Sequence, residues 1–362
     1  MPGEKFRRQG DDMQATTATN IRSPKPVKNR ATKVQTLRFY AQLGALALNV
    51  WIGVQFYLFV QYVRSGDAAQ AISRPPGVEG WLPIGSLVSL RYWWESGILN
   101  EIHPSGAIIL LVVLVSALLF RKAFCSWVCP VGFFSEILGD FADKTYRRRL
   151  RLPRWLDYPL RGIKYLLLAF FFWAILIQMT PESIKAFVYS DYNVVSDILM
   201  LRFFTDISTF SLAVIGGLFV LSLIIRGFWC RYLCPYGALV GLLGLLSPTR
   251  IKRNVKTCID CTACAKVCPS FIKVDQIKSV NSDECTGCMS CVDACPVDRT
   301  LEVKVGNLKS PVPVIRWAAV VLIFFWGTLA VAKFWGPWEN SVSDQQYMER
   351  VHQADRGEYV HP

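Results

Sequence analysis

Eight cysteines between Cys258 and Pro296 constrain this chain more than any other part of its sequence. They form the pattern Cys-x2-Cys-x2-Cys-x3-Cys-Pro twice, and 16 residues lie between Cys268 of the first copy and Cys285 of the second. Three thiolates at this short spacing surround one 4Fe-4S cluster, while the fourth, placed before the proline, reaches the neighbouring cluster. The segment is therefore predicted to fold back on itself around two clusters.

The two-cluster bacterial ferredoxins have the same cysteine spacing, and this spacing predicts two ligand sets. The first cluster is assigned to Cys258, Cys261, Cys264 and Cys295, and the second to Cys285, Cys288, Cys291 and Cys268. Structural zinc is a weaker interpretation, because zinc sites use two cysteine pairs and not a third regularly spaced cysteine followed by Cys-Pro. Thr262 stands where a small glycine would be usual, which leaves the ligand set unchanged.

The composition indicates a membrane protein. Of the 362 residues, 52% are hydrophobic and 13% are aromatic, and the mean hydropathy is positive. A soluble chain that carries a small cluster domain would be less apolar. The net charge of +13 does not indicate nucleic acid, because the basic residues lie beside apolar runs and do not form one patch with interleaved aromatic side chains. The lipid bilayer is therefore the expected partner, and nucleic acid is not.

Five apolar runs are long enough to cross a membrane. They cover residues 39–63, 105–124, 163–179, 207–229 and 312–332. We therefore expect a mainly α fold, a polytopic helical bundle of five spans with a small α+β two-cluster ferredoxin domain. The predicted layout is a disordered basic tail (1–37), a membrane hairpin that ends in an amphipathic helix (38–146), a second membrane hairpin (147–248), the ferredoxin domain (249–310), the fifth span (311–335) and a tail (336–362). Residues 64–104 and 180–206 are expected to be polar loops.

The distribution of lysine and arginine predicts the orientation of the chain. The N-terminal tail, the segment after the second span with Arg147, Arg148 and Arg149, and the ferredoxin segment are rich in both residues, whereas the other loops are poor in them. Basic loops stay in the cytoplasm. We therefore expect a bacterial inner membrane protein with its N-terminus and clusters in the cytoplasm and its C-terminus in the periplasm. A reducing cytoplasm also argues against disulfides.

The membrane part repeats itself. Seven residues of one copy recur in the other, each shifted by 105 positions. They are Arg121, Cys125, Cys129, Pro130, Gly132, Leu138 and Gly139, followed by Arg226, Cys230, Cys234, Pro235, Gly237, Leu243 and Gly244. The repeat predicts two related hairpins about a pseudo-twofold axis, each ending in Cys-x3-Cys-Pro.

The role of the four membrane cysteines stays open at this point. They are Cys125, Cys129, Cys230 and Cys234. On a continuous helix the two cysteines of each pair share a face, and Arg121 or Arg226 lies one turn earlier on that face, where it would favour the thiolate. Together the four thiolates would suit a third iron-sulfur cluster, a soft ion such as copper, or disulfide redox chemistry. The alternative is that they are small buried residues at a close helix crossing.

The four motifs in this order resemble the NapH, NosR and CcoG group of membrane polyferredoxins. The resemblance covers about residues 38–335 and rests on 124–132, 229–237, 258–269 and 285–296. It implies electron transfer between the cytoplasmic side or the quinone pool and an extracytoplasmic respiratory or metal-maturation partner. A NosR-like flavin domain and a CcoG-like immunoglobulin domain are not expected.

The sequence contains few residues that could bind other cofactors. Membrane haem normally needs two histidines within spans, and the chain has only His103, His352 and His361, so haem is not expected. No Gly-rich dinucleotide or Walker motif follows a strand, so NAD is not expected either. A quinol site needs a titratable group at the membrane edge, and Glu95, Glu101 and His103 form the one candidate cluster. Residues of this kind are more often interfacial anchors.

The sequence therefore predicts a membrane-bound carrier of single electrons with two 4Fe-4S clusters, a redox partner protein and no catalytic side chain. Two alternatives remain. The first is a metal reductase, for example of copper, that uses the four membrane cysteines in cofactor assembly. The second is a redox-sensing scaffold that carries no electron flux.

Overall fold

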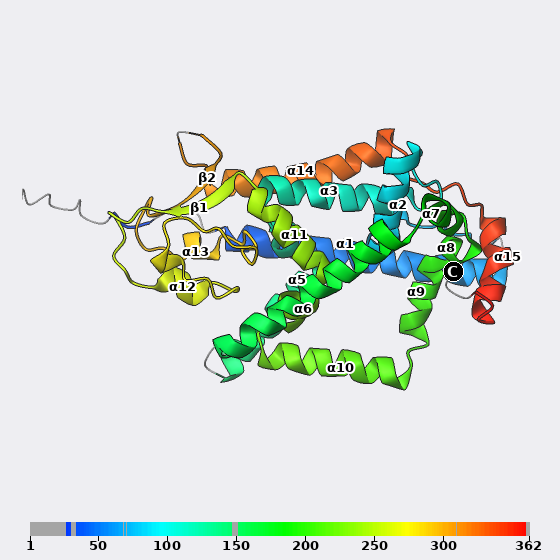
Figure 1. The fold of residues 1–362 in the computed structure, drawn as a ribbon, viewed down its shortest axis with the longest axis horizontal. Helices are drawn as coiled ribbons and strands as arrows, with labels where there is room; N and C mark the ends of the chain where they lie inside the picture. Colours follow the sequence, from blue (N-terminus) through cyan, green and yellow to red (C-terminus); the bar gives the residue numbers. More distant parts are fainter. Residues whose placement is uncertain are drawn as a thin grey trace, which may run out of the picture.

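The computed structural model describes residues 27–29, 34–67, 69, 71–146, 151–308 and 310–359. Figure 1 shows a bundle of helices with a small domain of two strands and short helices at one end. Most of the predicted basic tail, Arg147, Arg148 and Arg149 of the predicted basic segment, and His361 lie outside the described residues. Of the tail, 27–29 and 34–37 are described, and they contact the ferredoxin domain.

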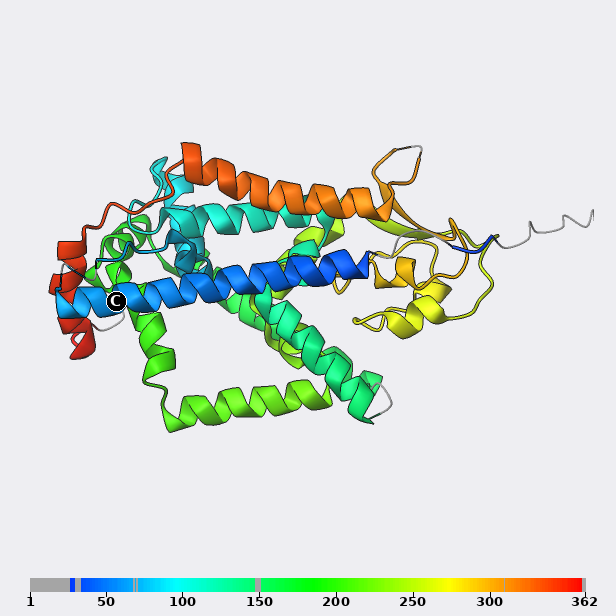
Figure 2. The same ribbon diagram turned by 180° about the vertical axis from the view of Figure 1, so that it is seen from behind.

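Long apolar helices form the bundle. Helix α1 (Gln35–Ser65) runs from the ferredoxin end to the opposite end, with α3 (Pro104–Phe120) and α14 (Val314–Trp335) along it (Figures 1 and 2). Helix α6 (Arg154–Trp173) continues into a π turn, Ala174–Gln178. These helices expose large apolar side chains such as Trp51, Leu166 and Ile323. Apolar outer faces of this kind suit contact with lipid.

The structure supports the five predicted spans only in part. Three helices are long and apolar enough to cross a membrane: α1, α6 with its π turn, and α14. A fourth is possible if α9 (Ser196–Thr205) and α10 (Thr209–Ile224), which meet at 79°, count as one span. Helix α3 has 17 residues and stops at Arg121, which has a φ of 64° and a ψ of −151°. This backbone conformation ends the predicted 105–124 run early.

Short helices occupy the segments predicted to be polar loops or a tail. The first loop forms a 3-10 turn (Pro76–Trp81) and α2 (Pro83–Ser96). The second forms α7 (Pro181–Val188), α8 (Asp191–Val194) and α9, and the C-terminal segment forms α15 (Asp344–Asp355). Local sequence starts several of them, because Thr180, Ser190 and Ser343 accept hydrogen bonds from backbone N–H groups of the first turn. Helices α2, α7, α8 and α15 lie together at the end opposite the ferredoxin domain (Figure 1).

The two sequence repeats pack against each other reciprocally. In the first copy, the short helix α4 (Ala123–Trp127) follows the end of α3, and α5 (Pro130–Tyr146) follows Cys129. In the second copy, the π turn Trp229–Leu233 follows the end of α10, and α11 (Pro235–Leu246) follows Cys234. A Cβ on Gly139 of α5 would lie 2.6 Å from Cγ of Arg226, and one on Gly244 of α11 would lie 3.2 Å from Cα of Arg121. Each repeat thus places its glycine against the arginine of the other repeat.

The ferredoxin domain is built from two similar halves. Strand β1 (Thr249–Arg253) pairs antiparallel with β2 (Leu301–Val305). The segment between the strands carries both cysteine copies and contains α12 (Ala263–Val267), a 3-10 turn (Val274–Gln276) and α13 (Ser290–Asp293). Thr262 and Met289, which follow the second cysteine of each copy, have φ values of 59° and 61°. That conformation explains why glycine would be usual there.

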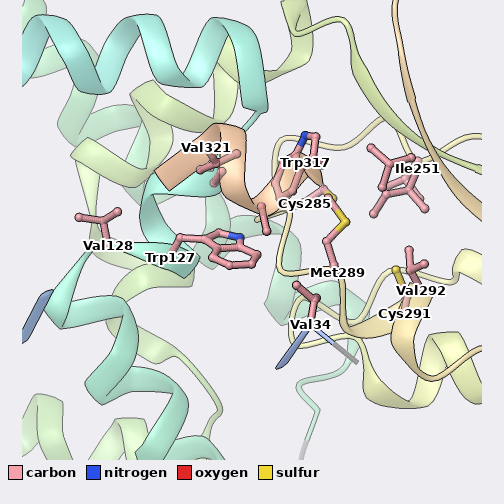
Figure 3. Close-up of a cluster of buried hydrophobic side chains, with 14 of the residues drawn as sticks. Val34, Trp127, Val128, Ile251, Cys285, Met289, Cys291, Val292, Trp317 and Val321 are labelled. Carbon is pink, nitrogen blue, oxygen red and sulfur yellow. The ribbon is translucent and has the colours of Figure 1, made fainter. Parts of the chain in front are cut away.

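The ferredoxin domain and the bundle share one hydrophobic core. Trp127 and Val128 of the first repeat, Trp317 of α14 and Met289 of the second cysteine motif are buried together (Figure 3). The domain is therefore docked on the membrane helices through side-chain packing and is more than a tethered module.

The start of the described chain fastens α1 to the same domain. We call residues 27–29, 34 and 35 the N-terminal strap. Asn29 N–H donates to the carbonyl of Pro296 at 2.8 Å, and Val34 N–H donates to Oδ2 of Asp293 at 2.7 Å. Gln35 Nε2 donates to the carbonyl of Cys288 at 2.9 Å. Asp293 of the ferredoxin domain therefore caps the first turn of α1.

Candidate functional site

The structure places the first predicted ligand set around one small cavity. Cys258, Cys261, Cys264 and Cys295 all line it, together with Thr262, Asp275 and Pro296. The fourth cysteine of the second copy thus joins the three of the first, as the exchange of the Cys-Pro cysteines predicts. Cys261 is exposed and Cys264 is buried, so this cavity lies at the outer edge of the domain.

The second predicted ligand set is more deeply placed. Cys268, Cys285, Cys288 and Cys291 are all buried. Burial raises the pKa of the Cys268 thiol to about 11, and the neighbouring Cys288 and Cys285 add to the shift. Burial also raises the pKa of Cys291 well above its ordinary value, again helped by the neighbouring cysteines. Buried thiols that crowd in this way lose their protons readily only when a cation replaces them.

The four membrane cysteines meet at a larger cavity of about 1060 Å³. Cys125 lies in α4, Cys129 precedes α5, Cys230 lies in the π turn and Cys234 precedes α11. Their thiols are close enough to interact electrostatically. Cys288 of the second ligand set lines the same cavity. The repeat therefore brings both Cys-x3-Cys-Pro motifs to one site beside the ferredoxin domain.

Each Cys-x3-Cys-Pro motif is a helix break and not one face of a continuous helix. The proline occupies the first position of the next helix, where its missing N–H is not needed. Cys234 caps α11, and its Sγ accepts a hydrogen bond from Gly237 N–H at 3.2 Å. The positive end of a helix favours a thiolate at this position. This correction to the predicted geometry gives the second cysteine of each motif a helix N-terminus as its stabilising partner.

No three His, Cys, Asp or Glu side chains within the described ranges approach closely enough to hold one metal ion. Wider spacing suits a 4Fe-4S cluster, because each thiolate binds a different iron atom.

The two repeat arginines direct their hydrogen bonds away from the membrane thiols. Arg121 donates from Nη1 to the carbonyl of Val280 at 2.9 Å and from Nη2 to that of Ser282 at 2.7 Å. It thus holds the loop that leads into Cys285. Arg226 forms ion pairs of 2.7 Å with both Asp140 and Asp143 of α5.

Lys122 is a cation near the membrane thiols that the sequence did not reveal. Lys122 is buried, lines the cavity and interacts electrostatically with Cys125, Cys230 and Cys234. A signal for it existed in the repeat, because the position 105 residues later is Gly227. A lysine that only one copy carries, directly after an apolar run, indicates a role that the two copies do not share.

The predicted quinol-site residues do not form one cluster. Glu95 pairs with Arg91 at 2.8 Å on the exposed side of α2. Glu101 is exposed, and its carbonyl accepts a hydrogen bond from Ser341 N–H at 2.9 Å. His103 is buried, and its Nε2 lies 2.7 Å from the carbonyl of Asn193.

His103 belongs instead to a buried ionic network at the end opposite the ferredoxin domain. Arg74 pairs with Glu79 at 2.9 Å and with Asp197 at 2.7 Å, and Nδ1 of His103 lies 3.3 Å from Oε1 of Glu79. Burial alone would raise the pKa of Glu79, but the charge of Arg74 and hydrogen bonds from His103 and Ser105 lower it to about 2. The network ties α9 to the turn that precedes α2.

Comparison with known proteins agrees with the two kinds of cysteine site. Residues 102–153 and 207–254 match the family described as "4Fe-4S binding domain", and these stretches contain the two Cys-x3-Cys-Pro motifs. Residues 250–296 match the family described as "4Fe-4S dicluster domain". No solved structure matches the chain.

Three relatives show the range of proteins with this layout. YccM of Escherichia coli, an electron transport protein by name, is 43% identical over 324 residues, which cover 88% of this chain and 90% of YccM. The ferredoxin-type protein NapH of Escherichia coli is 29% identical over 54% of this chain and 65% of NapH. Protein NirI of Paracoccus denitrificans is 29% identical over 59% of this chain and 31% of NirI. The chain belongs to the family of membrane-associated 4Fe-4S polyferredoxin-type electron transport proteins.

Proposed function

We propose that this protein passes single electrons between its ferredoxin domain and its membrane cysteine site. The observation that carries the proposal is the grouping of Cys258, Cys261, Cys264 and Cys295 around one cavity. A 4Fe-4S cluster, when bound, supplies a one-electron redox change that needs no bond-making side chain. Cys268, Cys285, Cys288 and Cys291 hold the second cluster in this proposal.

The two ligand sets differ in exposure, and this difference gives the relay an order. Exposed Cys261 brings the first set to the surface, where a soluble redox partner can approach. The second set is buried against the bundle. Its loop is latched to the first repeat, because Ser126 Oγ donates to the carbonyl of Thr286 at 2.7 Å and Trp127 Nε1 donates to that of Gly287 at 3.1 Å. Figure 3 shows Trp127 and Trp317 of the bundle beside Cys285.

We infer that Cys125, Cys129, Cys230 and Cys234 hold a third iron-sulfur cluster and not a single copper ion. The match of both motifs to a 4Fe-4S binding domain supports this inference, as does the cavity that the four side chains share. The helix N-terminus at Cys234 and the buried Lys122 favour thiolates there. Residues Phe325 and Trp326 of α14 close one side of this cavity with apolar surface.

The proposed setting is the bacterial inner membrane, with five spans and the ferredoxin domain in the cytoplasm. The lysine and arginine distribution supports this orientation. Helix α3 reaches the required length only with the turn of α4 that follows it. The quinone pool and a respiratory or maturation protein are the proposed exchange partners at the membrane side.

Metal analysis of the anaerobically purified protein tests the proposal. We expect about twelve iron and twelve sulfide per chain, four for each cluster. The double variant Cys129→Ser/Cys234→Ser should lose about four of each, and Cys264→Ser should lose iron from the first set. Lys256→Gln, close to the first set but not a ligand, serves as the control and should keep all of the iron. Iron-free protein would refute the electron-transfer proposal, and eight irons that survive the double variant would refute the third cluster alone.

A further inference from the structure

Lys122 is a buried cation that faces the membrane cysteine site. Only 4% of its surface is exposed, and it lines the cavity that Cys125, Cys129, Cys230 and Cys234 also line. It follows directly on Arg121, whose unusual backbone conformation ends α3. The helix break therefore turns the lysine inward, at a position where a continuous helix would carry on along the span.

Other cations at this end of the cavity have carboxylate partners. Arg38 pairs with Glu136, Arg226 pairs with Asp143, and Arg231 pairs with Asp157.

Lys122 is different. It takes part in no hydrogen bond or ion pair with any residue in the described ranges, and the nearby carboxylate of Glu284 is bound to Lys164. Its electrostatic partners are Glu284 and the thiols of Cys125, Cys234 and Cys230. An ammonium group that faces a cavity and has no carboxylate in direct contact attracts negative charge into that cavity. The Lys122 side chain is therefore stabilised by negative charge on the cysteine side of the cavity.

We propose that Lys122 is the counter-cation of an anionic iron-sulfur group held by Cys125, Cys129, Cys230 and Cys234, and that it raises the reduction potential of that group. The inference rests on the proposed function of the four cysteines. A cluster with four thiolate ligands is negatively charged and gains one further negative charge on reduction, and net charge is one determinant of its potential. The ammonium group attracts the reduced form more strongly than the oxidised form.

The redox step is balanced by electron movement alone. With clusters bound, Cys268, Cys285, Cys288 and Cys291 would hold the electron donor, and the four membrane cysteines would hold the acceptor of one electron. No bond forms or breaks, and Lys122 keeps its proton. Because the two repeats differ at this position, with Gly227 in the second copy, the positive charge is supplied from one side of the pseudo-symmetric site.

Redox titration of the complete protein in lipid nanodiscs, followed by EPR, tests the inference. The relevant signal is the one that disappears in Cys129→Ser/Cys234→Ser. In Lys122→Met we expect its reduction equilibrium to weaken by tenfold or more, a fall in midpoint potential of at least about 59 mV for one electron. Lys122→Arg should restore the potential, and Lys333→Met, at an exposed position lining the same cavity farther along α14, should leave it unchanged.

The outcomes separate this inference from the proposed function. A protein with twelve irons and an unshifted signal in Lys122→Met would overturn the role of Lys122 and leave the third cluster intact. Loss of four irons in Lys122→Met supports the inference if Lys122→Arg recovers them, and overturns it if Lys122→Arg does not. Wild-type protein with eight irons and no signal that depends on Cys129 and Cys234 would overturn both.

Discussion

Gly132 gives the sharpest test of how the membrane cysteines are positioned. It lies in the first turn of α5, and an added Cβ would be 2.1 Å from the carbonyl oxygen of Cys125. Ordinary contact begins at 3.4 Å, so the carbonyl or the helix must move by about 1.3 Å. We expect Gly132→Ala to lower the free energy of unfolding by about 1–3 kcal/mol. Because Cys125 itself moves and ligand sites tolerate shifts of about 0.5 Å, the variant should also lose iron from the membrane site.

The second repeat supplies a matched control. Gly237 is the equivalent residue, but its added Cβ would lie 3.5 Å from Sγ of Cys234 and 3.6 Å from the carbonyl oxygen of Cys230, which is ordinary contact. Alanine is favoured over glycine within a helix, so Gly237→Ala should be neutral or slightly stabilising. Iron and sulfide content and detergent-induced unfolding of both variants provide the measurement. Equal behaviour of the two variants would show that the asymmetry of the repeats has been misread.

Two further predictions concern buried charges. Lys164→Met leaves Glu284 buried without its ion-pair partner and should lower the free energy of unfolding by about 3–5 kcal/mol. The double variant Lys164→Met/Glu284→Met should regain most of this lost stability. A double variant as unstable as the single one would contradict this explanation. The pKa of Glu79 in the folded protein is about 2, below its ordinary value of 4.5, so the stabilisation from this carboxylate is present above about pH 4.5 and lost as the pH falls toward 2. Between pH 6 and pH 3, thermal unfolding should show a smaller loss of stability in Glu79→Gln than in wild type, and Glu101→Gln serves as the exposed control. If all three proteins lose the same stability over this pH range, Glu79 is not the source of the acid sensitivity.

Short-range spacing made the ferredoxin half predictable. The grouping of Cys295 with Cys258, Cys261 and Cys264 follows from chain geometry over a few residues and from the proline after the fourth cysteine. The repeat likewise predicted two related hairpins that each end in Cys-x3-Cys-Pro, because seven residues recur at one offset. Both inferences depend on patterns that the sequence displays directly.

Long-range contacts explain what the sequence did not show. The helix break at Arg121 is held by the carbonyls of Val280 and Ser282, about 160 residues away, and no local pattern reports them. The same break turns Lys122 into the cavity. His103 was grouped with Glu95 and Glu101 by sequence proximity, but its partners Asn193 and Glu79 lie on other elements. The apolar run 105–124 also extends beyond the end of α3 at Phe120, because hydropathy contains no information about such contacts.

The N-terminal strap has a consequence for biogenesis. The hydrogen bond between Val34 and Asp293 joins residues 259 positions apart, so Val34 leaves the ribosome long before Asp293 is synthesised. The first turn of α1 therefore lacks the Asp293 cap while the residues between Ser65 and Asp293 are synthesised. The cysteine loops of the ferredoxin domain are therefore accessible for metal delivery until the strap forms.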